Sequence, residues 1–431
     1  MNLFLRLRYL SLPLFLLIAI VELTNAQSVA ELRCTAFGKG QNLSNWLEAR
    51  WQTNYPTPDG YTFADVVKMK ESGIQSLRLP ICFAALTDSV APYEVDTASA
   101  VWDRIDTVIS WADALQMNVI IDNHHEWDIF NQNWRTKLPR FAHLWSVVAQ
   151  RYSYLDPNRY TFELLNEPAF GIAIDSLNEV FRVTIDTIRQ YTTAHTIIVS
   201  PNFSSSGQAY EGYQPFADTN LIYTWHSYDP YQFTHQGFSW ASPSVPLGTT
   251  FPSLMTMLEN AWYQVTNWQA TYHKPVFLGE FGTGVFGDDV SRCNWIEYFG
   301  TRLDSFNMPW FYWDWRWDFS MFNSHVVSGD SIIPCFKHSL HLYGDTLSGI
   351  GETSVLPLQV YPNPVSDVCT VSTTNNEPAT LTLLDAEGRR YFTTSFTGVY
   401  QLPLKQWSNG IYFVQVSSKG RYGIKRLVVQ H

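Results

Sequence analysis

The sequence predicts a (β/α)8 barrel, of the TIM type, followed by a small all-β domain. From about residue 36 to residue 343, eight strand-like apolar runs alternate with helix-length amphipathic stretches. Polar, titratable and aromatic side chains fall at the carboxyl ends of these runs, which is where barrels of this kind assemble their active sites. After Gly344 the pattern changes to short alternating strands that are separated by turn-forming residues.

The first 26 residues, 1–26, are expected to be a secretory signal peptide that has no part in the fold. Arg6 and Arg8 precede an apolar run from Tyr9 to Val21, which is too short to span a bilayer, and Ala26 offers a cleavage site. No later segment is apolar enough to cross a membrane. We therefore expect a protein without a membrane span that is secreted or attached to the cell surface.

The composition narrows the possible partners. The formal net charge is −11, and charged residues make up 16% of the chain where about 25% is usual. This balance argues against nucleic acid and anionic membranes as partners. Aromatic residues also make up 16%, with 17 Trp and 23 Tyr. The core takes most of these rings, but so many tryptophans favour an uncharged, sugar-like ligand on which a ring can stack.

The cysteines do not indicate a metal site. Five follow the signal peptide, and no two of them form a CxxC pair: Cys34, Cys82, Cys293, Cys335 and Cys369. An exported protein can form disulfides. The first four cysteines allow three pairings, between which the sequence does not choose.

Eight apolar runs are the expected barrel strands: residues 37–43, 74–80, 118–125, 161–167, 196–201, 221–228, 275–282 and 308–315. Helical patterns between them include residues 62–73 and 102–117. A barrel of this kind typically has about 250 residues or more, which agrees with a domain over residues 30–345. An open, doubly wound sheet is the alternative.

The end of the chain is expected to form a second domain. Residues 346–356 are small and polar, as in a linker. Residues 357–431 contain alternating strands within 379–392, 410–418 and 423–429, with turn residues between them. We expect a small Ig-like sandwich here.

The side chains at the expected strand ends are the candidate site: Arg78, His124, His125, Asn166, Glu167, His226, Tyr228, Glu280 and Trp313. Pro168 biases Glu167 toward an extended conformation, so the fourth strand is expected to continue to Glu167. Glu280 likewise closes an apolar run.

Two carboxylates that face one cleft suit glycoside hydrolysis, in which one group is a proton donor and the other is ionised. Mutual repulsion and partial burial would separate their pKa values, and Glu167 is expected to be protonated at rest. For either glutamate alone, a structural role as a helix cap or as the ion-pair partner of an arginine is as good an interpretation as a catalytic role. The pair together with the histidines and the tyrosine favours catalysis.

The His124-His125-Glu126 run does not predict a metal centre. Neighbouring residues of a strand point to opposite faces, so the two histidines would not share one metal ion, and no carboxylate spacing repeats a zinc pattern. No metal and no cofactor is expected. One of the two histidines could be a core residue bonded to a neighbour, and His124 is preferred as the sugar contact.

Six motifs, in order, resemble glycoside hydrolase family five: GKGQNLSNWLE, LRLP, IDNHH, LLNEP, HSYDP and FLGEFG. The stretch HSYDPYQFTHQGFSW resembles a branch of bacterial cellulases, some of which also accept mannan. The resemblance implies a secreted, retaining endo-β-1,4-glucanase with Glu167 as acid/base and Glu280 as nucleophile. A β-mannanase or broad β-glucan hydrolase is the alternative in the family, and a non-catalytic glycan-binding protein is the alternative from another class.

The resemblance also implies roles for the other residues. Arg78 and Tyr228 would keep Glu280 ionised, His226 would lie beside Glu167, and Asn166 would bond the 2-hydroxyl of the sugar. The remaining family-like positions would line the substrate site: His124, His125 and Trp313 at the cleaved sugar, and, less securely matched, Asn42, Glu48, His235 and Trp240.

The stretch after Trp313 departs from the family. DWRWDFSMFN is more charged and aromatic than the glycine-containing turn usual there. The family often has a non-proline cis peptide after this tryptophan, and we expect one between Trp313 and Asp314, since such bonds cluster at active sites.

The tail, from YPNPVSD to GIKRLVVQH, resembles the type A sorting domain of the type IX secretion system. This implies the type IX secretion machinery as a partner. The resemblance to glycoside hydrolase family five implies a polysaccharide as the substrate, and we expect a monomer. The alternative is a small carbohydrate-binding module, but the tail has few aromatic residues, mainly Trp407 and Tyr412, and this favours sorting.

Overall fold

The structure is a computed structural model. It describes residues 27–49, 60–126, 133–168, 173–202, 206–251, 256–322, 332–342, 356–373, 377–385, 389–419 and 421–431. The expected signal peptide, residues 1–26, lies outside the described residues, and so does most of the expected linker. The exact domain bounds therefore stay predictions. In the described part of the chain, no helix has both the length and the apolar character that a membrane span needs.

Eight parallel strands form a closed barrel, in which β1 pairs with both β2 and β8. This confirms the predicted barrel and excludes the open sheet. The strands are β1 (Lys39–Asn42), β2 (Ser76–Ile81), β3 (Asn118–Asn123), β4 (Tyr160–Glu163), β5 (Ile197–Val199), β6 (Leu221–Ser227), β7 (Val276–Phe281) and β8 (Trp310–Tyr312).

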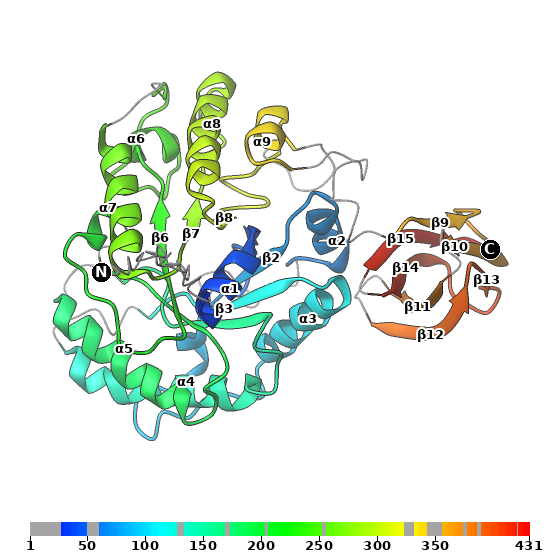
Figure 1. The fold of residues 1–431 in the computed structure, drawn as a ribbon, viewed down its shortest axis with the longest axis horizontal. Coiled ribbons are helices and arrows are strands. Elements are labelled where there is room, and N and C mark those ends of the chain that lie inside the picture. The colour runs from blue at the N-terminus through cyan, green and yellow to red at the C-terminus, as the bar shows by residue number, and fades with distance from the viewer. Residues whose placement is uncertain are drawn as a thin grey trace, which may run out of the picture.

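Helices surround the barrel, as Figure 1 shows. They are α1 (Val29–Phe37), α2 (Phe63–Glu71), α3 (Ala100–Leu115), α4 (Trp134–Tyr152), α5 (Ile174–Arg189), α6 (Tyr231–Thr234), α7 (Thr256–Tyr272), α8 (Asp289–Phe306) and α9 (Pro334–Ser339), with short 3-10 turns η1 (Phe83–Leu86) and η3 (Gly207–Tyr210). The expected helices at 62–73 and 102–117 correspond to α2 and α3.

Helix α1 packs against the apolar end of the barrel interior. Ser28 caps the helix, because its hydroxyl accepts from the backbone N–H of Glu31 at 3.2 Å. At the other end of the helix, Phe37 packs edge-on against Phe277 and Phe311, with ring centroids 5.3 and 5.6 Å apart. This apolar layer leaves the carboxyl ends of the strands as the polar end of the barrel.

Strand β4 is shorter than expected. It ends at Glu163, four residues before Glu167, so the prediction that the strand continues to Glu167 is wrong. The N–H of Leu164 still bonds to Ile198 on β5, but the N–H of Asn166 turns to Asn123 on β3. Because the backbone changes partner here, the regular ladder stops and consecutive side chains no longer have to alternate between faces.

The C-terminal domain is all-β, as predicted. One sheet has the order β13-β10-β9 and the other β12-β11-β14-β15, and apolar residues such as Val371, Leu381 and Val414 fill the space between them. The strands are β9 (Leu358–Tyr361), β10 (Val368–Thr373), β11 (Pro378–Leu384), β12 (Arg390–Thr397), β13 (Val399–Pro403), β14 (Gly410–Ser418) and β15 (Arg421–Val429).

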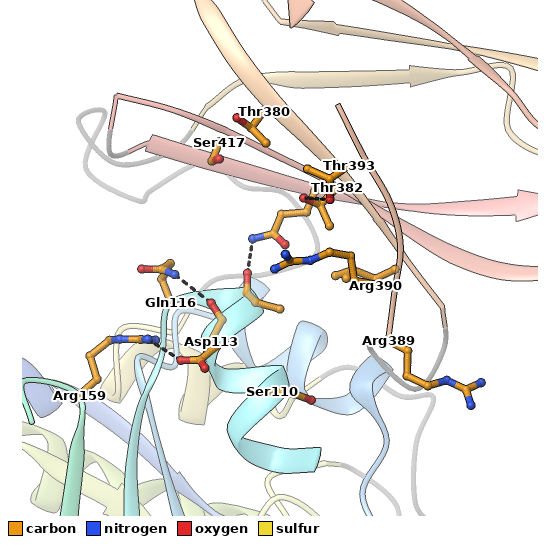
Figure 2. A pocket seen from close by; sticks show the side chains of 13 residues that line it. Ser110, Asp113, Gln116, Arg159, Thr380, Thr382, Arg389, Arg390, Thr393 and Ser417 are labelled. Carbon is orange, nitrogen blue, oxygen red and sulfur yellow. Dashed lines mark hydrogen bonds and ion pairs between the residues drawn. The ribbon is translucent and has the colours of Figure 1, made fainter. Parts of the chain in front are cut away.

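The sheet of this domain contacts helices α2 and α3 of the barrel. Phe413 of β14 packs edge-on against Phe63 of α2 at 5.0 Å, and the Gln415 side chain donates to the carbonyl oxygen of Ala114. A polar cleft of about 780 Å³ lies beside this contact (Figure 2). Its lining includes one carboxylate, Asp113, which pairs with Arg159. The cleft therefore lacks the paired carboxylates that glycoside hydrolysis requires.

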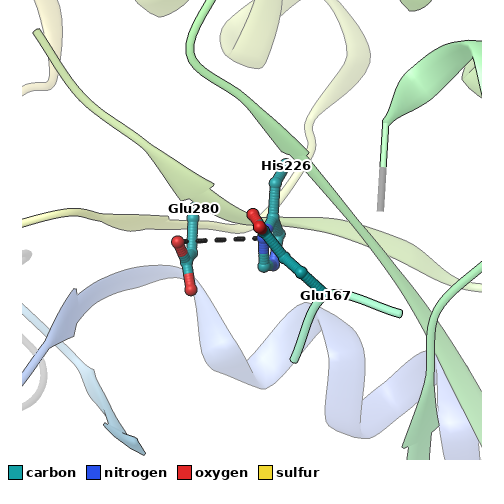
Figure 3. A group of neighbouring side chains, drawn as sticks. All are labelled: Glu167, His226 and Glu280. Carbon is teal, nitrogen blue, oxygen red and sulfur yellow. Dashed lines mark hydrogen bonds and ion pairs between the residues drawn. The ribbon is translucent and has the colours of Figure 1, made fainter. Parts of the chain in front are cut away.

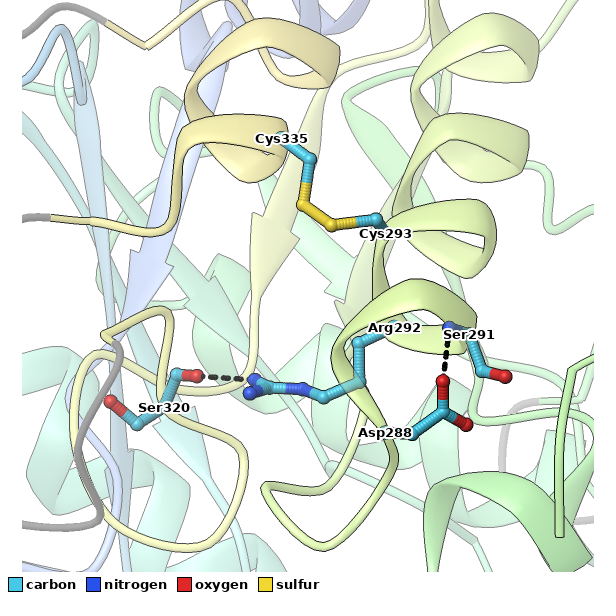
Figure 4. Close-up of a disulfide and its surroundings, with 6 residues drawn as sticks. All are labelled: Asp288, Ser291, Arg292, Cys293, Ser320 and Cys335. Carbon is cyan, nitrogen blue, oxygen red and sulfur yellow. Dashed lines mark hydrogen bonds between the residues drawn. A yellow bond between two sulfur atoms is a disulfide. The ribbon is translucent and has the colours of Figure 1, made fainter.

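A disulfide joins α8 to α9. Cys293 and Cys335 are bonded, with their Cα atoms 5.6 Å apart (Figure 4). The other three cysteines form no disulfide in the described part of the chain, and all three are buried: Cys34, Cys82 and Cys369. The structure thus contains one bond among the first four cysteines, and none of their three complete pairings is formed.

Candidate active site

Arg78 of β2 lies at the centre of the polar end of the barrel. Its fully buried guanidinium pairs with Asp122 at 3.0 Å, Glu163 at 2.7 Å and Glu280 at 2.5 Å. It also donates to the side-chain oxygens of Asn42 and Asn166, at 3.0 and 2.7 Å. A buried cation is tolerated when its donors are satisfied in this way, so these contacts fix the guanidinium in place.

Glu280 lies near the carboxyl end of β7 and has a donor at each oxygen. Arg78 donates to Oε1, and the hydroxyl of Tyr228 donates to Oε2 at 2.8 Å. Burial raises the pKa of Glu280, while the neighbouring His226, Arg78 and Tyr228 oppose this rise. The environment therefore favours an ionised Glu280 more than it favours an ionised Glu167, which has fewer such donors.

Glu167 lies just beyond the end of β4. Its side chain is 32% exposed, and its Oε1 lies 2.8 Å from Nδ1 of His226. Burial of the carboxyl group raises its pKa to about 7, and Arg78 partly offsets this effect. A carboxyl group with this pKa holds a proton for a large part of the time near neutral pH, which a general acid requires.

His226 connects the two glutamates. The register between β6 and β7 shifts at Trp225/His226, and this places His226 opposite Glu280. Its Nδ1 lies 2.8 Å from Glu167 and 3.8 Å from Glu280, as Figure 3 shows. Burial lowers the pKa of His226 to about 4, so the ring is neutral at pH 7. Register shifts of this kind often redirect a side chain beside an active site.

The carboxylates of Glu167 and Glu280 are close together. One ligand atom from each of Glu167, His226 and Glu280 lies within 4.8 Å of the others. Such a trio contains the donor types of a metal site. However, Nδ1 of His226 already bonds Glu167, and the guanidinium of Arg78 would repel a cation beside Glu280. The residues therefore fit a proton-transfer site better than a metal site.

Trp313 and the two histidines pack together. The half-buried Trp313 stacks on His124 at 5.4 Å with an interplanar angle of 13°, and the ring of His125 lies 4.7 Å from that of His124. His124 bonds Asp122 through Nδ1 at 2.6 Å, and burial lowers its pKa, so its ring is neutral. The peptide between Trp313 and Asp314 is cis, which confirms that prediction.

The four positions that match the family less securely lie in two parts of the structure. Asn42 is fully buried beneath the site, where its amide donates to Gly279 and Tyr312. Glu48 is also buried and accepts from the N–H of Trp46 at 3.1 Å. These contacts support the loop and the barrel, and substrate contact by Asn42 and Glu48 stays a prediction.

His235 and Trp240 lie together in the long connection after β6. The His235 ring packs on Tyr231, Tyr228 and Trp240, with the closest centroid 4.1 Å away. Trp240 is 54% exposed, and its indole donates to Asp318 at 2.7 Å. His235 therefore lies beside Tyr228, the partner of Glu280, and Trp240 lies against His235.

Two charged residues of the site, Asp122 and Glu163, were missed by sequence reasoning. Both are fully buried and bond Arg78, and Glu163 does so through two hydrogen bonds of 2.7 and 2.9 Å. Burial raises the pKa of each to about 7, although Arg78 lowers it. The sequence did contain a signal for Asp122. Strand alternation directs Asp122 to the same face as the buried Ile120, and a carboxylate on a buried face needs a partner.

Paired glutamates at the carboxyl end of a (β/α)8 barrel are an arrangement of barrel glycosidases. Residues 34–318 match the family Cellulase (glycosyl hydrolase family 5), which amounts to more than half of the chain. The chain belongs to glycosyl hydrolase family 5. Residues 359–430 match a secretion system C-terminal sorting domain, which indicates a secreted or surface-attached protein.

Known relatives and solved structures agree with this assignment. Endoglucanase 3 of Fibrobacter succinogenes is 27% identical over 366 residues, which cover 72% of this chain but only 54% of that protein. A hyperthermophilic endo-beta-1,4-glucanase solved with substrate has a TM-score of 0.66 and 27% identity, and covers 73% of this chain and 100% of that one. Thermotoga maritima Cel5A, solved with mannotriose, has a TM-score of 0.65 and 25% identity, over 72% of this chain and 99% of that one.

Proposed function

We propose that the protein is an exported endo-β-1,4-glucanase that cleaves β-linked glucans with retention of configuration. The observation that carries this proposal is the closeness of Glu167 and Glu280, of which one oxygen each lies within 4.8 Å of the other. Retaining enzymes have carboxyl groups about 5–5.5 Å apart, whereas inverting enzymes need about 6.5–9.5 Å to admit a water molecule between them. The short separation supports direct attack by one glutamate.

In the first step, an ionised oxygen of Glu280 attacks the anomeric carbon, and the glycosidic C–O bond breaks. The proton on Glu167 moves to the leaving oxygen, so the shortened chain departs as an alcohol. In the second step, Glu167 takes a proton from water, and the resulting hydroxide attacks the same carbon. The bond to Glu280 breaks, Glu280 is again a carboxylate, and Glu167 is again protonated.

The mechanism needs one ionised and one protonated glutamate, and the surroundings of the two side chains differ accordingly. Arg78 and Tyr228 both stabilise negative charge on Glu280. Glu167 has the neutral His226 as its neighbour and a pKa of about 7. Glu280 is therefore the nucleophile and Glu167 the acid/base in this proposal. Asn166, whose side-chain oxygen accepts from Arg78, would bond the 2-hydroxyl of the sugar.

The test of the mechanism uses both glutamates. Glu280→Gln should abolish turnover of carboxymethyl-cellulose and keep glucan binding, since the amide cannot form a glycosyl-enzyme. Glu167→Ala should lower turnover by about 10²–10⁴-fold, the usual contribution of a general acid. Azide should partly restore that variant on a substrate with a good leaving group, giving a glycosyl azide with retained configuration.

Four results would overturn the proposal. Undiminished turnover by Glu280→Gln would exclude the nucleophile, and products of inverted configuration would exclude double displacement. A wild-type protein that binds glucan without cleaving it would be the non-catalytic alternative. Loss of activity on chelation would point to a metal-dependent hydrolase instead.

Mannan is the second candidate substrate. It is favoured by the similarity to Thermotoga maritima Cel5A, which has been solved in complex with mannotriose. Neither catalytic carboxylate reads the orientation of the 2-hydroxyl group. Initial rates on cellulose, barley glucan, xyloglucan and glucomannan, with product lengths measured, would separate a glucanase from a mannanase or a broad hydrolase.

The sorting-domain match supports the type IX secretion machinery as the export partner of the C-terminal domain. We infer that the enzyme acts as a monomer outside the cell. Sedimentation of the full chain would test the monomer, and loss of residues 357–431 should block export if the domain is the sorting signal.

A further inference from the structure

Two exposed tryptophans lie on loops that are tied together. Among the described residues, the only tryptophans with large exposed fractions are Trp240, at 54%, and Trp317, at 39%. Trp240 follows β6, and Trp317 belongs to the segment after β8, residues 313–322, which we call the β8 loop. Asp318 of this loop accepts the indole N–H of Trp240 at 2.7 Å. Both exposed rings are therefore held at the carboxyl end of the barrel.

The β8 loop is fixed to the barrel along its length. Near its start, Asp314 accepts from the hydroxyl of Ser44 at 2.8 Å. In its middle, Arg316 pairs with Asp65 at 2.7 Å. Further along, the carbonyl oxygen of Ser320 accepts from the Arg292 side chain at 2.8 Å, as Figure 4 shows. A loop held at these points needs little further ordering when a ligand binds, and this reduces the entropic cost of binding.

The conformation and exposure of Trp317 do not contribute to the stability of the fold in any evident way. Its φ of +81° lies in the left-handed region, which is unfavourable for a bulky side chain. Its neighbours Arg316 and Asp318 are both bonded, so they hold the backbone in this conformation. Within the described residues, the Trp317 indole forms no hydrogen bond and packs on no other aromatic ring. Strain of this kind persists most often at functional sites.

Trp317 also lies close in sequence to residues of the candidate active site on both sides. Trp313, four residues earlier, stacks on His124. Phe319, two residues later, packs against Tyr228 with centroids 5.4 Å apart, and Tyr228 bonds Glu280. The exposed indole thus belongs to a short segment that begins and ends at residues of the site.

We propose that Trp317 is a stacking platform for a sugar ring of the substrate chain beyond the ring that is cleaved. This inference rests on the proposed function. The faces of β-linked glucose and mannose units carry C–H groups, and a tryptophan offers these a broad apolar surface. The β8 loop would then favour long, unbranched β-linked chains over short oligosaccharides.

The test is Trp317→Asn, because asparagine tolerates the left-handed backbone better than other non-glycine residues. We expect the melting temperature to stay the same or rise, since strain is removed while the anchors remain. The ratio of kcat/KM on barley glucan to kcat/KM on an aryl cellobioside should fall about three- to tenfold, mainly through KM. Trp317→Phe, which keeps an aromatic face, should recover most of the loss.

Tyr263→Asn is the matched control, because Tyr263 is 62% exposed on α7 and lies in no part of the site. It should leave the ratio unchanged. An unchanged ratio in folded Trp317→Asn would overturn the inference while leaving the proposed function intact, and so would an equal loss on both substrates. An inactive wild-type protein would instead overturn the proposed function.

Discussion

The Nη1 atom of Arg78 lies 2.5 Å from Oε1 of Glu280, and both side chains are almost completely buried. The same guanidinium also pairs with Asp122 and Glu163. One buried cation therefore pairs with three carboxylates, and Glu280 shares the positive charge of Arg78 with two fully buried carboxylates. The acidity of Glu280 depends on all of these partners.

The pH profile should fall on its alkaline side near pH 7. Glu167 must be protonated to assist the leaving group, and its pKa is about 7. As the pH rises through this value the proton is lost, so kcat/KM on barley glucan should decrease above about pH 7. Rates between about pH 5 and pH 9 measure this. In Glu167→Ala, assayed on an activated aryl glycoside, the alkaline fall should disappear, and its persistence would assign it to another group.

Tyr228→Phe should move the acidic limb of the profile to higher pH. The tyrosine hydroxyl bonds the ionised form of Glu280 at 2.8 Å, so its removal raises the pKa of Glu280. Hydrogen bonds to charged groups contribute about 1.5–3 kcal/mol, and about 1.4 kcal/mol corresponds to one pKa unit. We expect the acidic limb to move by about one to two pH units. An acidic limb at its original pH, in a variant that is still folded, would contradict this assignment.

Glu163→Ala should strongly destabilise the barrel. It removes two hydrogen bonds from Arg78 at a site without solvent, and breaking a buried ion pair costs about 3–5 kcal/mol. Glu163→Gln keeps an acceptor and should cost less. The measurement is urea-induced unfolding. Glu179→Ala is the control, since Glu179 pairs with the largely exposed Arg135 at 3.4 Å and should cost at most about 1 kcal/mol. Equal costs for the two alanine variants would show that the Arg78 network contributes no special stability.

Replacing both Cys293 and Cys335 by alanine should lower the free energy of unfolding by about 2–4 kcal/mol. The disulfide closes a loop with a sequence separation of 42 residues, and opening it increases the entropy of the unfolded chain. Thermal unfolding of the wild type with and without reductant, beside the double variant, measures the effect. A reductant that destabilises the double variant as much as the wild type would show that the disulfide is not the cause.

The barrel could be predicted from the sequence because each strand and helix carries its own periodicity. The paired glutamates could be found because each closes an apolar run. The ion-pair network around Arg78 could not be predicted. Glu163 lies within an expected strand, and its pairing with Arg78 is visible only in the three-dimensional structure. The predicted end of β4 was also wrong. Pro168 restricts the conformation of Glu167 alone, whereas the strand ends because the backbone changes its hydrogen-bond partner from β5 at Leu164 to β3 at Asn166.

The disulfide has a consequence for where the enzyme can be active. The chain between Cys293 and Cys335 contains β8, Trp313 and the whole β8 loop. In a reducing cytoplasm these residues would lack their covalent closure, although Glu167 and Glu280 lie outside the loop that the disulfide closes. Thiol oxidation occurs in the compartments reached by exported proteins. We therefore expect the segment that carries Trp313 and Trp317 to gain its covalent closure only after export from the cytoplasm.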